Sequence, residues 1–392
     1  MLNSEKIIGL FNDSFPPVMD GVTLTVQNYV KWLTASGYHT CVVTPWNPIT
    51  PPEHKDFDLY RYFSLGIASR KPYRYGYPKL DPFIWHKMRT IPFRLVHSHC
   101  PFSSGRLAMY AAKHQNVPLV ATFHSKYRTD LEHSLPTWMV KRIMRRVIDF
   151  FNAADEVWIP QSKVEDTVRE YGYKGPLTVV ENGIDLAMDN FDSTWSYKTQ
   201  VRKELGFSDD EMVLLFVGQH IREKGVNVII DAIDCLRDLP VKMVFIGNGY
   251  AVEEMRHHIA RLNLNDRIAL KGLITDRDEL KKYYAAAHLF LFPSFYDNAP
   301  LVVREAAMMG TPAVLLMGST ASEVINEGVN GFLAENTPQS YAEKIRHLYA
   351  HSDELCNAAK GAALTLTRSW RQVIDEVIDR YKVIIDRYER KH

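Results

Sequence analysis

Two carboxylates in the segment from 289 to 312 are the side chains that point most directly to chemistry. Asp297 lies in a polar loop, and Glu305 lies eight positions later in a helix that we expect to begin near Pro300 and Leu301. Free amides at such a helix start attract anions, phosphate above all. A carboxylate accepts well from a vicinal diol. The segment therefore suits a sugar nucleotide, which carries hydroxyls on both sides of a diphosphate; the alternative is an ordinary strand–helix unit with two solvated acids.

A buried strand and a helix must position these acids. The apolar run at 289–292 predicts the strand, and Gly310 and Pro312 predict the end of the helix. In a parallel sheet, this kind of turn lies at the carboxyl edge, where ligands bind. Lys224 precedes another predicted helix at that edge, and there it opposes the helix dipole at a cost of about 0.3–1 kcal/mol unless an anion is bound. We therefore expect Lys224 to meet a diphosphate as a point charge.

Three histidines follow neighbouring predicted strands in the first half of the chain. His97 and His99 end the strand expected at 93–99, and His124 follows the strand expected at 118–123. The pattern places all three at one sheet edge, where each is either a catalyst or a hydrogen-bonded structural group. Two histidines spaced by one residue also suggest a metal, but the sequence nearby does not supply a full set of further ligands, so we expect no metal site.

Length and composition favour a two-domain globular protein. The chain has 392 residues, of which 46% are hydrophobic and 24% charged. Its four cysteines form no CxxC pair, which argues against a zinc site or a disulfide framework and favours a reducing compartment. No apolar run approaches the ~20 residues of a membrane span, and the first residues lack the apolar core of a signal peptide. We therefore expect a cytoplasmic protein.

Charge is spread unevenly along the chain. The net charge is +1, yet residues 1–160 hold 19 Lys and Arg against 12 Asp and Glu. This excess suits an anionic partner but is too mild to imply nucleic acid. Residues 136–151 predict an amphipathic basic helix that either lies on the inner face of an anionic membrane or packs with its basic side in solvent. Residues 50–92 predict a mostly irregular segment with a short helix at 82–89, which either holds sugars or anionic lipids or merely packs as a loop.

The remaining pattern predicts strand–helix units on a parallel sheet in both halves. A helix at 23–35 follows a loop in which Gly21 would let a ligand approach the backbone closely. This loop lacks the GxGxxG fingerprint of a nicotinamide dinucleotide site. Ser162 is expected to cap a helix, and a long amphipathic helix follows Trp370. Further strands are expected at 6–11, 38–44, 155–159, 178–180, 213–217, 242–246, 268–270 and 314–316, the last of these being the final main strand.

Several ordered motifs together point to a family. They are DGV at 20–22, TFHS at 122–125, ENGID at 181–185, GQHIREKG at 218–225, GNG at 247–249 and PSFYD followed by Glu305. Over nearly its whole length the chain resembles the retaining family 4 glycosyltransferases (glycosyl transferases group 1). The resemblance implies the α/β GT-B fold, with two Rossmann-like domains facing across a cleft. The acceptor-side domain would comprise residues 1–187 with a returning helix at 370–392, and the nucleotide-sugar domain residues 188–369.

The resemblance also implies a role for each matching residue. Glu305 would bind the ribose diol, Asp297 the hydroxyls of the transferred sugar, and Lys224 the diphosphate. His124, Lys224 and Asp297 would form the catalytic group. Donor binding would involve Gly21, Val22, Arg222, Lys224, Leu273, Asn298, Ala299, Pro300, Leu301, Val302 and Glu305, and the acceptor side would involve Asp20, His99 and Lys126.

Two positions depart from the family pattern. Asp297 stands where the family usually has Glu, and Gln219 stands where it usually has Arg; Arg222 is a candidate replacement for that arginine. The predicted activity is retaining transfer of a hexose from a nucleotide diphosphate sugar to a membrane lipid or cell-envelope glycan, with no metal and no resident cofactor. A GT-B-fold epimerase or phosphorylase, or a non-catalytic sugar-nucleotide-binding partner, is the alternative.

Overall fold

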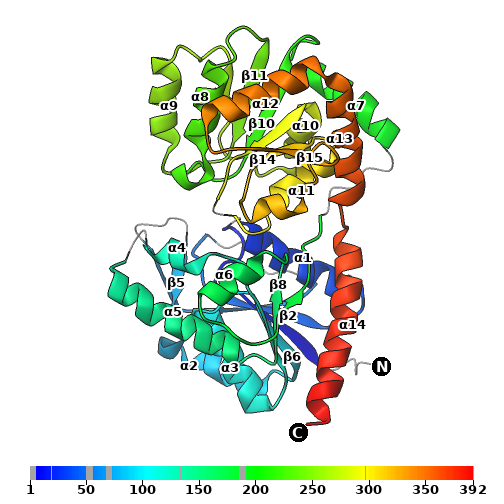
Figure 1. The fold of residues 1–392 in the computed structure, drawn as a ribbon. Helices are drawn as coiled ribbons and strands as arrows, with labels where there is room; N and C mark the ends of the chain where they lie inside the picture. The colour runs from blue at the N-terminus through cyan, green and yellow to red at the C-terminus, as the bar shows by residue number, and fades with distance from the viewer. Residues whose placement is uncertain are drawn as a thin grey trace. The chain divides into compact units, whose positions relative to one another are not determined.

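The computed structural model describes residues 6–18, 20–49, 56–67, 73–132, 135–184, 191–295 and 297–391. The chain divides into two compact units (Figure 1), the first formed by Met1–Gly183 with Ser369–His392 and the second by Ile184–Arg368. The boundary predicted between residues 187 and 188 lies outside the described residues, as does Asp185 of the ENGID motif. The division into two units does not test which unit binds the acceptor and which the donor, so both roles stay predictions.

A seven-stranded parallel sheet, in the order β3-β2-β1-β6-β7-β8-β9, forms the centre of the first unit. Buried apolar residues dominate its inner strands, as expected for a parallel sheet covered on both faces. The strands are β1 (Ile7–Phe11), β2 (Thr40–Pro45), β3 (Asp58–Tyr62), β6 (Phe93–Ser98), β7 (Leu119–Thr122), β8 (Glu156–Ile159) and β9 (Thr178–Val179). The helices are α1 (Gly21–Ala35), α2 (Pro82–Thr90), α3 (Ser103–Gln115), α4 (Tyr127–Glu132), α5 (Thr137–Asn152), α6 (Val164–Glu170) and α14 (Trp370–Glu389).

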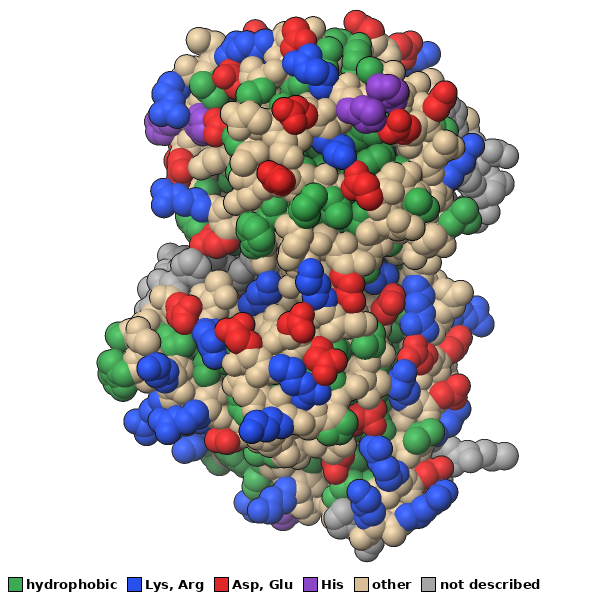
Figure 2. All heavy atoms as spheres, viewed as in Figure 1, with side chains coloured by type: hydrophobic (Ala, Val, Ile, Leu, Met, Phe, Trp, Pro, Cys, Tyr) green, Lys and Arg blue, Asp and Glu red, His purple; other side chains and the backbone are tan. Residues whose placement is uncertain are grey.

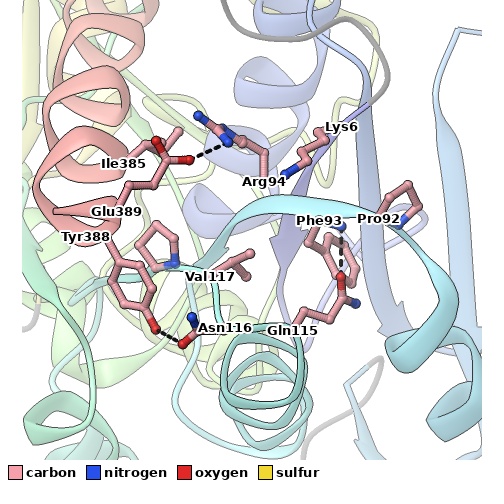
Figure 3. A pocket seen from close by; sticks show the side chains of 11 residues that line it. Lys6, Pro92, Phe93, Arg94, Gln115, Asn116, Val117, Ile385, Tyr388 and Glu389 are labelled. Atoms are coloured by element: carbon pink, nitrogen blue, oxygen red, sulfur yellow. Dashed lines mark hydrogen bonds and ion pairs between the residues drawn. The ribbon is translucent and has the colours of Figure 1, made fainter. Parts of the chain in front are cut away.

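The last helix, α14, belongs to the first unit, as predicted. It begins with a capping box in which Ser369 and Gln372 satisfy each other's backbone amides, and it packs on α1 and β6. Its last turn borders a cavity of about 260 Å³ at the amino ends of β1, β6 and β7 (Figure 3). Two contacts cross this cavity: Arg94 pairs with Glu389 at 2.6 Å, and the Tyr388 hydroxyl donates to Asn116 at 3.2 Å. These contacts attach α14 to the sheet.

The second unit contains a six-stranded parallel sheet in the order β12-β11-β10-β13-β14-β15. Apolar residues that recur at helical spacing from Val226 to Leu236, in and just after α8 (Val226–Asp234), are all buried: Val226, Ile229, Ile230, Ile233 and Leu236. The strands are β10 (Met212–Val217), β11 (Val241–Ile246), β12 (Ile268–Leu270), β13 (Leu289–Phe292), β14 (Ala313–Leu316) and β15 (Gly331–Ala334). The helices are α7 (Phe191–Glu204), η3 (Arg222–Lys224), α8 (Val226–Asp234), α9 (Val252–Arg261), α10 (Arg277–Ala286), α11 (Leu301–Met308), η4 (Ala321–Val324), α12 (Pro338–Ala350) and α13 (Ser352–Thr365).

Three expectations about secondary structure were wrong. The segment expected to be irregular contains β3, a short antiparallel pair of β4 (Ser64–Gly66) and β5 (Arg74–Gly76), and η2 (Pro78–Leu80). β15 follows β14, which was expected to be the last strand. Both β3 and β15 are edge strands, which have one strand neighbour and a weaker hydrophobic pattern. At α6 the capping residue is Lys163 rather than Ser162, whose carbonyl accepts from Glu165 N at 2.9 Å.

Candidate functional site

The β13–α11 turn has the form predicted for it. β13 ends at Phe292, and α11 begins at Leu301 with Pro300 as its capping residue. The helix ends before Gly310, which has a φ of +63°. Gly310 N donates to the Ala307 carbonyl and Thr311 N to the Ala306 carbonyl, each at 2.9 Å, so a left-handed glycine closes the helix. The amides at the start of α11 therefore lie at the carboxyl edge of the sheet.

Lys224 and Asp297 form an ion pair beside this turn. Lys224 Nζ lies 3.1 Å from Asp297 Oδ1, and the two side chains are only 11% and 18% exposed. The same ammonium lies 5.4 Å from the centre of the Phe292 ring. The Ser294 hydroxyl donates to Asp297 Oδ2 at 2.7 Å, which holds the carboxylate from its other side. The electrostatic cost expected for a lysine before α8 is thus offset by a carboxylate in this structure.

Gly225 makes this approach of two loops possible. Its φ is +69°, and a Cβ there would lie 2.7 Å from the Pro293 carbonyl oxygen. Only glycine combines this backbone conformation with so close a neighbour. The residue after Lys224 therefore brings the lysine against the loop that carries Asp297.

Glu305 is buried on α11 and held by two partners from α10. Arg277 donates to Oε1 at 2.6 Å, and the Tyr284 hydroxyl donates to Oε2 at 2.8 Å. The residue is 5% exposed, and burial followed by the Glu305 charge raises the pKa of Tyr284 well above its usual value. Neither partner was predicted from the sequence. Arg277 and Tyr284 are seven residues apart, which places them two turns apart on one face of α10. This spacing was the sequence feature that could have indicated a shared partner.

Arg222, the candidate replacement for the family arginine, is paired elsewhere. Its guanidinium contacts Glu254 at 2.7 Å, and its side chain is 69% exposed. Leu273, expected beside the nucleotide base, is also exposed and follows Gly272, whose carbonyl accepts from Gly247 N at 2.8 Å. The other predicted donor residues of this unit lie at the start of α11: Asn298 and Leu301 are buried, and Ala299, Pro300 and Val302 are half-buried.

In the first unit, Asp20 caps α1. Its Oδ1 accepts from Thr23 N at 2.7 Å, and the Ser14 hydroxyl donates to Oδ2 at 3.3 Å. The helix begins at Gly21, two residues earlier than expected, because the cap lies at Asp20. A Cβ on Gly21 would meet no described atom within 4 Å, so packing among the described residues does not require glycine there. Val22 follows in the first turn and is half-buried.

The three histidines form a stack at the carboxyl edge of the first sheet. The His97 and His99 ring centres are 4.1 Å apart, and those of His99 and His124 are 5.3 Å apart. His97 is fully buried and serves structure: its Nδ1 lies 2.6 Å from the Tyr381 hydroxyl and its Nε2 2.7 Å from the Thr122 hydroxyl. His97 thus links the sheet to α14.

The middle histidine fixes how His124 can act. His99 Nδ1 lies 3.0 Å from His124 Nε2, while His99 Nε2 is buried with no hydrogen-bond partner among the described residues. Buried N–H groups left without an acceptor are rarer in proteins than buried acceptors left without a donor. We therefore assign the proton of His99 to Nδ1, so that it donates to His124 Nε2. Burial lowers the pKa of His124 to about 3, and the neutral ring then carries its proton on Nδ1.

Lys126, the other predicted acceptor-side residue, lies just before α4 and is half-buried. Its carbonyl accepts from Asp130 N at 3.2 Å, which helps to start the helix. Asp13, which the sequence analysis did not select, organises the same edge. Its carboxylate accepts from Ser104 N at 2.8 Å and from the Tyr62 hydroxyl at 3.1 Å. Asp13 therefore fixes the start of α3.

Neither a cluster of metal ligands nor a membrane-spanning helix occurs among the described residues. No group of three or more His, Cys, Asp or Glu side chains among them could hold a metal ion. No helix in the described part of the chain is long and apolar enough to cross a membrane.

Comparisons with known proteins match both units. The family described as "Glycosyltransferase Family 4" matches residues 19–188, and that described as "Glycosyl transferases group 1" matches residues 198–364. The alpha-monoglucosyldiacylglycerol synthase of Acholeplasma laidlawii is 23% identical over 98% of this chain and 98% of its own length. The enzyme of the same name from Streptococcus pneumoniae is 24% identical over 83% of this chain and 74% of its own.

Solved structures give the same fold. Anabaena Alr3699/HepE, crystallised in complex with UDP and glucose, superposes with a TM-score of 0.76 at 18% identity, over 96% of this chain and 99% of the other.

Proposed function

The chain belongs to the family 4 glycosyltransferases of the GT-B fold, and on that premise we propose that it transfers a hexose, with retention, from a nucleotide diphosphate sugar to a hydroxyl of a membrane lipid. The observation that carries the donor half of this proposal is the cluster in the second unit. Within that unit, Lys224 contacts Asp297 at 3.1 Å, and Glu305 lies in the helix whose first amides follow Asp297. A diphosphate flanked by hydroxyls matches this combination of charge and hydrogen-bond acceptors.

Donor binding would exchange the partners of the partly buried ion pair. A diphosphate oxygen would replace Asp297 as the partner of Lys224, and Asp297, still held by Ser294, would accept from hydroxyls of the sugar. Glu305 would accept from the ribose diol with lone pairs that Arg277 and Tyr284 leave available. The ion pair thus keeps Lys224 in position before the donor arrives.

The reaction needs little acid–base machinery. The bond between the anomeric carbon and the diphosphate oxygen breaks, the acceptor oxygen bonds to the same face of that carbon, and the acceptor proton passes to the leaving diphosphate. Stabilising the charge on that leaving group is the main catalytic contribution, and Lys224 and the backbone N–H groups of Asn298, Ala299, Leu301 and Val302 would supply it. His124, neutral and with its proton on Nδ1, would act as a hydrogen-bond donor rather than as a base.

A lipid acceptor is favoured by the surface of α5. Burial of Val140, Met144 and Val147 leaves a basic face outside, made of Lys141, Arg142, Arg145 and Arg146. Trp138, in the first turn, is 66% exposed. Lys and Arg side chains gather beside a hydrophobic group at the left of this unit in Figure 2, where Figure 1 places α5. Such a helix binds anionic bilayers through charge and interfacial aromatic groups. The two synthases named above carry diacylglycerol in their names.

Mass spectrometry of the acceptor tests this proposal. The purified chain would be incubated with UDP-, GDP- or ADP-linked hexoses and with diacylglycerol dispersed in vesicles. We expect the lipid to become heavier by one hexosyl unit with one of the donors. An isomerised donor with an unchanged acceptor would indicate an epimerase, and donor binding without turnover would indicate a non-catalytic partner; either result refutes the proposal.

A further inference from the structure

The β4–β5 hairpin of the first unit carries its large apolar side chains on a single face. Its register pairs Ser64 with Gly76, Leu65 with Tyr75 and Gly66 with Arg74, and Tyr77 N extends the ladder by donating to the Phe63 carbonyl at 2.8 Å. Ile67 N donates to the Tyr73 carbonyl at the other end, at 3.0 Å. Because side chains alternate along a strand, one face carries six apolar or aromatic residues. This hairpin face consists of Phe63, Leu65, Ile67, Tyr73, Tyr75 and Tyr77.

The hairpin is oriented opposite to an ordinary surface ribbon. Its small residues face inward: Ser64 is 1% exposed, and a Cβ on Gly76 would lie 2.3 Å from the Tyr62 ring. Its large residues face outward: Leu65 is 51% exposed, and Phe63, Tyr75 and Tyr77 are 42%, 40% and 38% exposed. An antiparallel ribbon normally buries its apolar face and exposes its polar one. A contiguous apolar surface of this kind marks an interaction site.

The apolar face is held firmly in place. Arg74 donates to the Ser64 hydroxyl and carbonyl, each at 2.9 Å, and its guanidinium lies 5.7 Å from the centre of the Trp46 ring. Arg106 of α3 donates to the Tyr75 hydroxyl at 3.1 Å. The Tyr75 and Tyr77 rings meet edge to face, with centres 5.1 Å apart. The face is therefore ordered without a partner, which reduces the entropy lost on binding.

The charge around the hairpin indicates the kind of partner. Arg74 lies on the hairpin, Lys79 follows it and Arg106 reaches it from α3, while the sequence from 59 to 113 contains a single acid, Asp81. Asp81 has a structural role, because its carboxylate accepts from Ile84 N and Phe63 N, each at 3.1 Å. Tyrosine favours the interface of a bilayer, where its ring is apolar and its hydroxyl is wet, and lysine and arginine favour anionic headgroups. An anionic bilayer satisfies both features.

The hairpin lies at the same edge of the first sheet as the residues predicted for the acceptor side. It directly follows β3, so it lies at the carboxyl edge of the first sheet. Tyr62, the last residue of β3, donates to Asp13 in the loop after β1 and lies 2.9 Å from the Ser103 hydroxyl. The histidine stack follows β6 and β7 at the same edge. A surface that binds lipid at this edge would bring headgroups to the acceptor side of the unit.

We propose that the hairpin face inserts into the headgroup region of an anionic bilayer and delivers the lipid acceptor to this edge. The proposal rests on the proposed function, because it assumes a lipid acceptor. It adds a second membrane contact to the basic face of α5. Two weak contacts are what stable but reversible binding to a membrane requires.

Vesicle flotation with the full chain tests this proposal. The double variant Leu65→Ser/Tyr75→Ser removes apolar area without touching the inner side of the hairpin. The matched control is Leu364→Ser/Val383→Ser, which removes two side chains that are 81% and 63% exposed on α13 and α14. Vesicles would contain phosphatidylcholine with or without phosphatidylglycerol and no acceptor. We expect the hairpin variant to bind phosphatidylglycerol vesicles on the order of tenfold or more weakly, and the control to bind like the wild type.

Activity measurements separate this proposal from the proposed function. The hairpin variant should lose transfer to acceptor lipid in vesicles but keep transfer to a short-chain acceptor in solution. Unchanged flotation of the folded variant would overturn the hairpin proposal while leaving the transferase proposal intact. A wild-type dimer in sedimentation velocity that the hairpin variant dissociates, together with unchanged flotation, would assign the face to a second copy and would likewise overturn the proposal. Absence of transfer to any lipid, with flotation still dependent on the hairpin, would count against the proposed function alone.

Discussion

Replacing Lys224 by Met removes the cation that pairs with Asp297, and it should cost about 10²–10³-fold in kcat. Two unit charges at their separation of 3.1 Å attract by about 5 kcal/mol at an effective dielectric constant of about 20. Desolvation consumes part of this energy, and loss of one charge-stabilising donor costs about 2.7–4 kcal/mol at comparable sites. Because the charge on the leaving group grows in the transition state, kcat should fall more than donor affinity.

The structure also indicates how to separate catalysis from folding in this experiment. Lys224→Met leaves the partly buried Asp297 carboxylate without its cation, which destabilises the fold. The double variant Lys224→Met/Asp297→Asn removes both charges and should recover most of the lost stability, while remaining as inactive as the single variant. Lys203→Met, which removes an exposed charge from α7, serves as the control and should leave kcat unchanged. Initial rates of donor turnover and urea unfolding would be measured on all four proteins. A folded Lys224→Met variant with wild-type turnover would refute the reasoning.

Further predictions concern the remaining parts of the site. Gly21→Ala should leave the urea midpoint unchanged, since a methyl group meets no described atom there, yet weaken donor binding in calorimetry; equal affinity would argue against backbone approach at Gly21. Glu305→Gln should weaken donor binding by about 1–3 kcal/mol, and unchanged calorimetric affinity would remove the ribose assignment. His99→Phe should shift the His124 ring nitrogens in ¹⁵N spectra, because the donor that fixes its tautomer is gone; identical shifts would disprove that assignment. Acidification from pH 7 to 5 should lower the unfolding free energy, by at most about 1.4 kcal/mol per pH unit for each buried histidine.

The sign of this pH effect follows from the lowered pKa of the histidines. Burial holds the pKa of His97 and His99 well below the ordinary value and brings that of His124 to about 3. At a pH between these lowered pKa values and about 6.5, the histidines bind protons in the unfolded chain but not in the folded chain. The stabilising contribution is therefore complete above about pH 6.5 and is lost as the pH falls. A stability profile that is flat from pH 7 to 5 would contradict the burial of the stack.

Local signals made the β13–α11 turn predictable from the sequence. An apolar run, a proline at the helix start and a glycine before Pro312 each act within a few residues, so they set the bounds of strand and helix without knowledge of the fold. The buried face of α8 was predictable for the same reason, because helical periodicity is itself a local property.

The contacts within the site were less accessible because they join distant parts of the chain. Lys224 and Asp297 are 73 residues apart, and nothing local to either indicates that they pair. Glu305 on α11 accepts from Arg277 and Tyr284 on α10. The sequence therefore predicted that both carboxylate oxygens bind a ligand, and it did not predict that they also bind these two side chains. The β4–β5 hairpin was missed although its apolar residues alternate, because each strand is only three residues long and ends in a glycine, which weakens the pattern of a strand.

The proton spectrum of the anomeric centre during turnover tests the central claim most directly. The full chain would be mixed with an α-linked nucleotide diphosphate hexose and a short-chain diacylglycerol in the presence of a chelator. We predict that the donor's anomeric signal disappears as an α-glycoside of the lipid and free nucleoside diphosphate appear in equal amounts. A β-glycoside, or consumption of the donor without a glycosylated lipid, would contradict retaining transfer by this site.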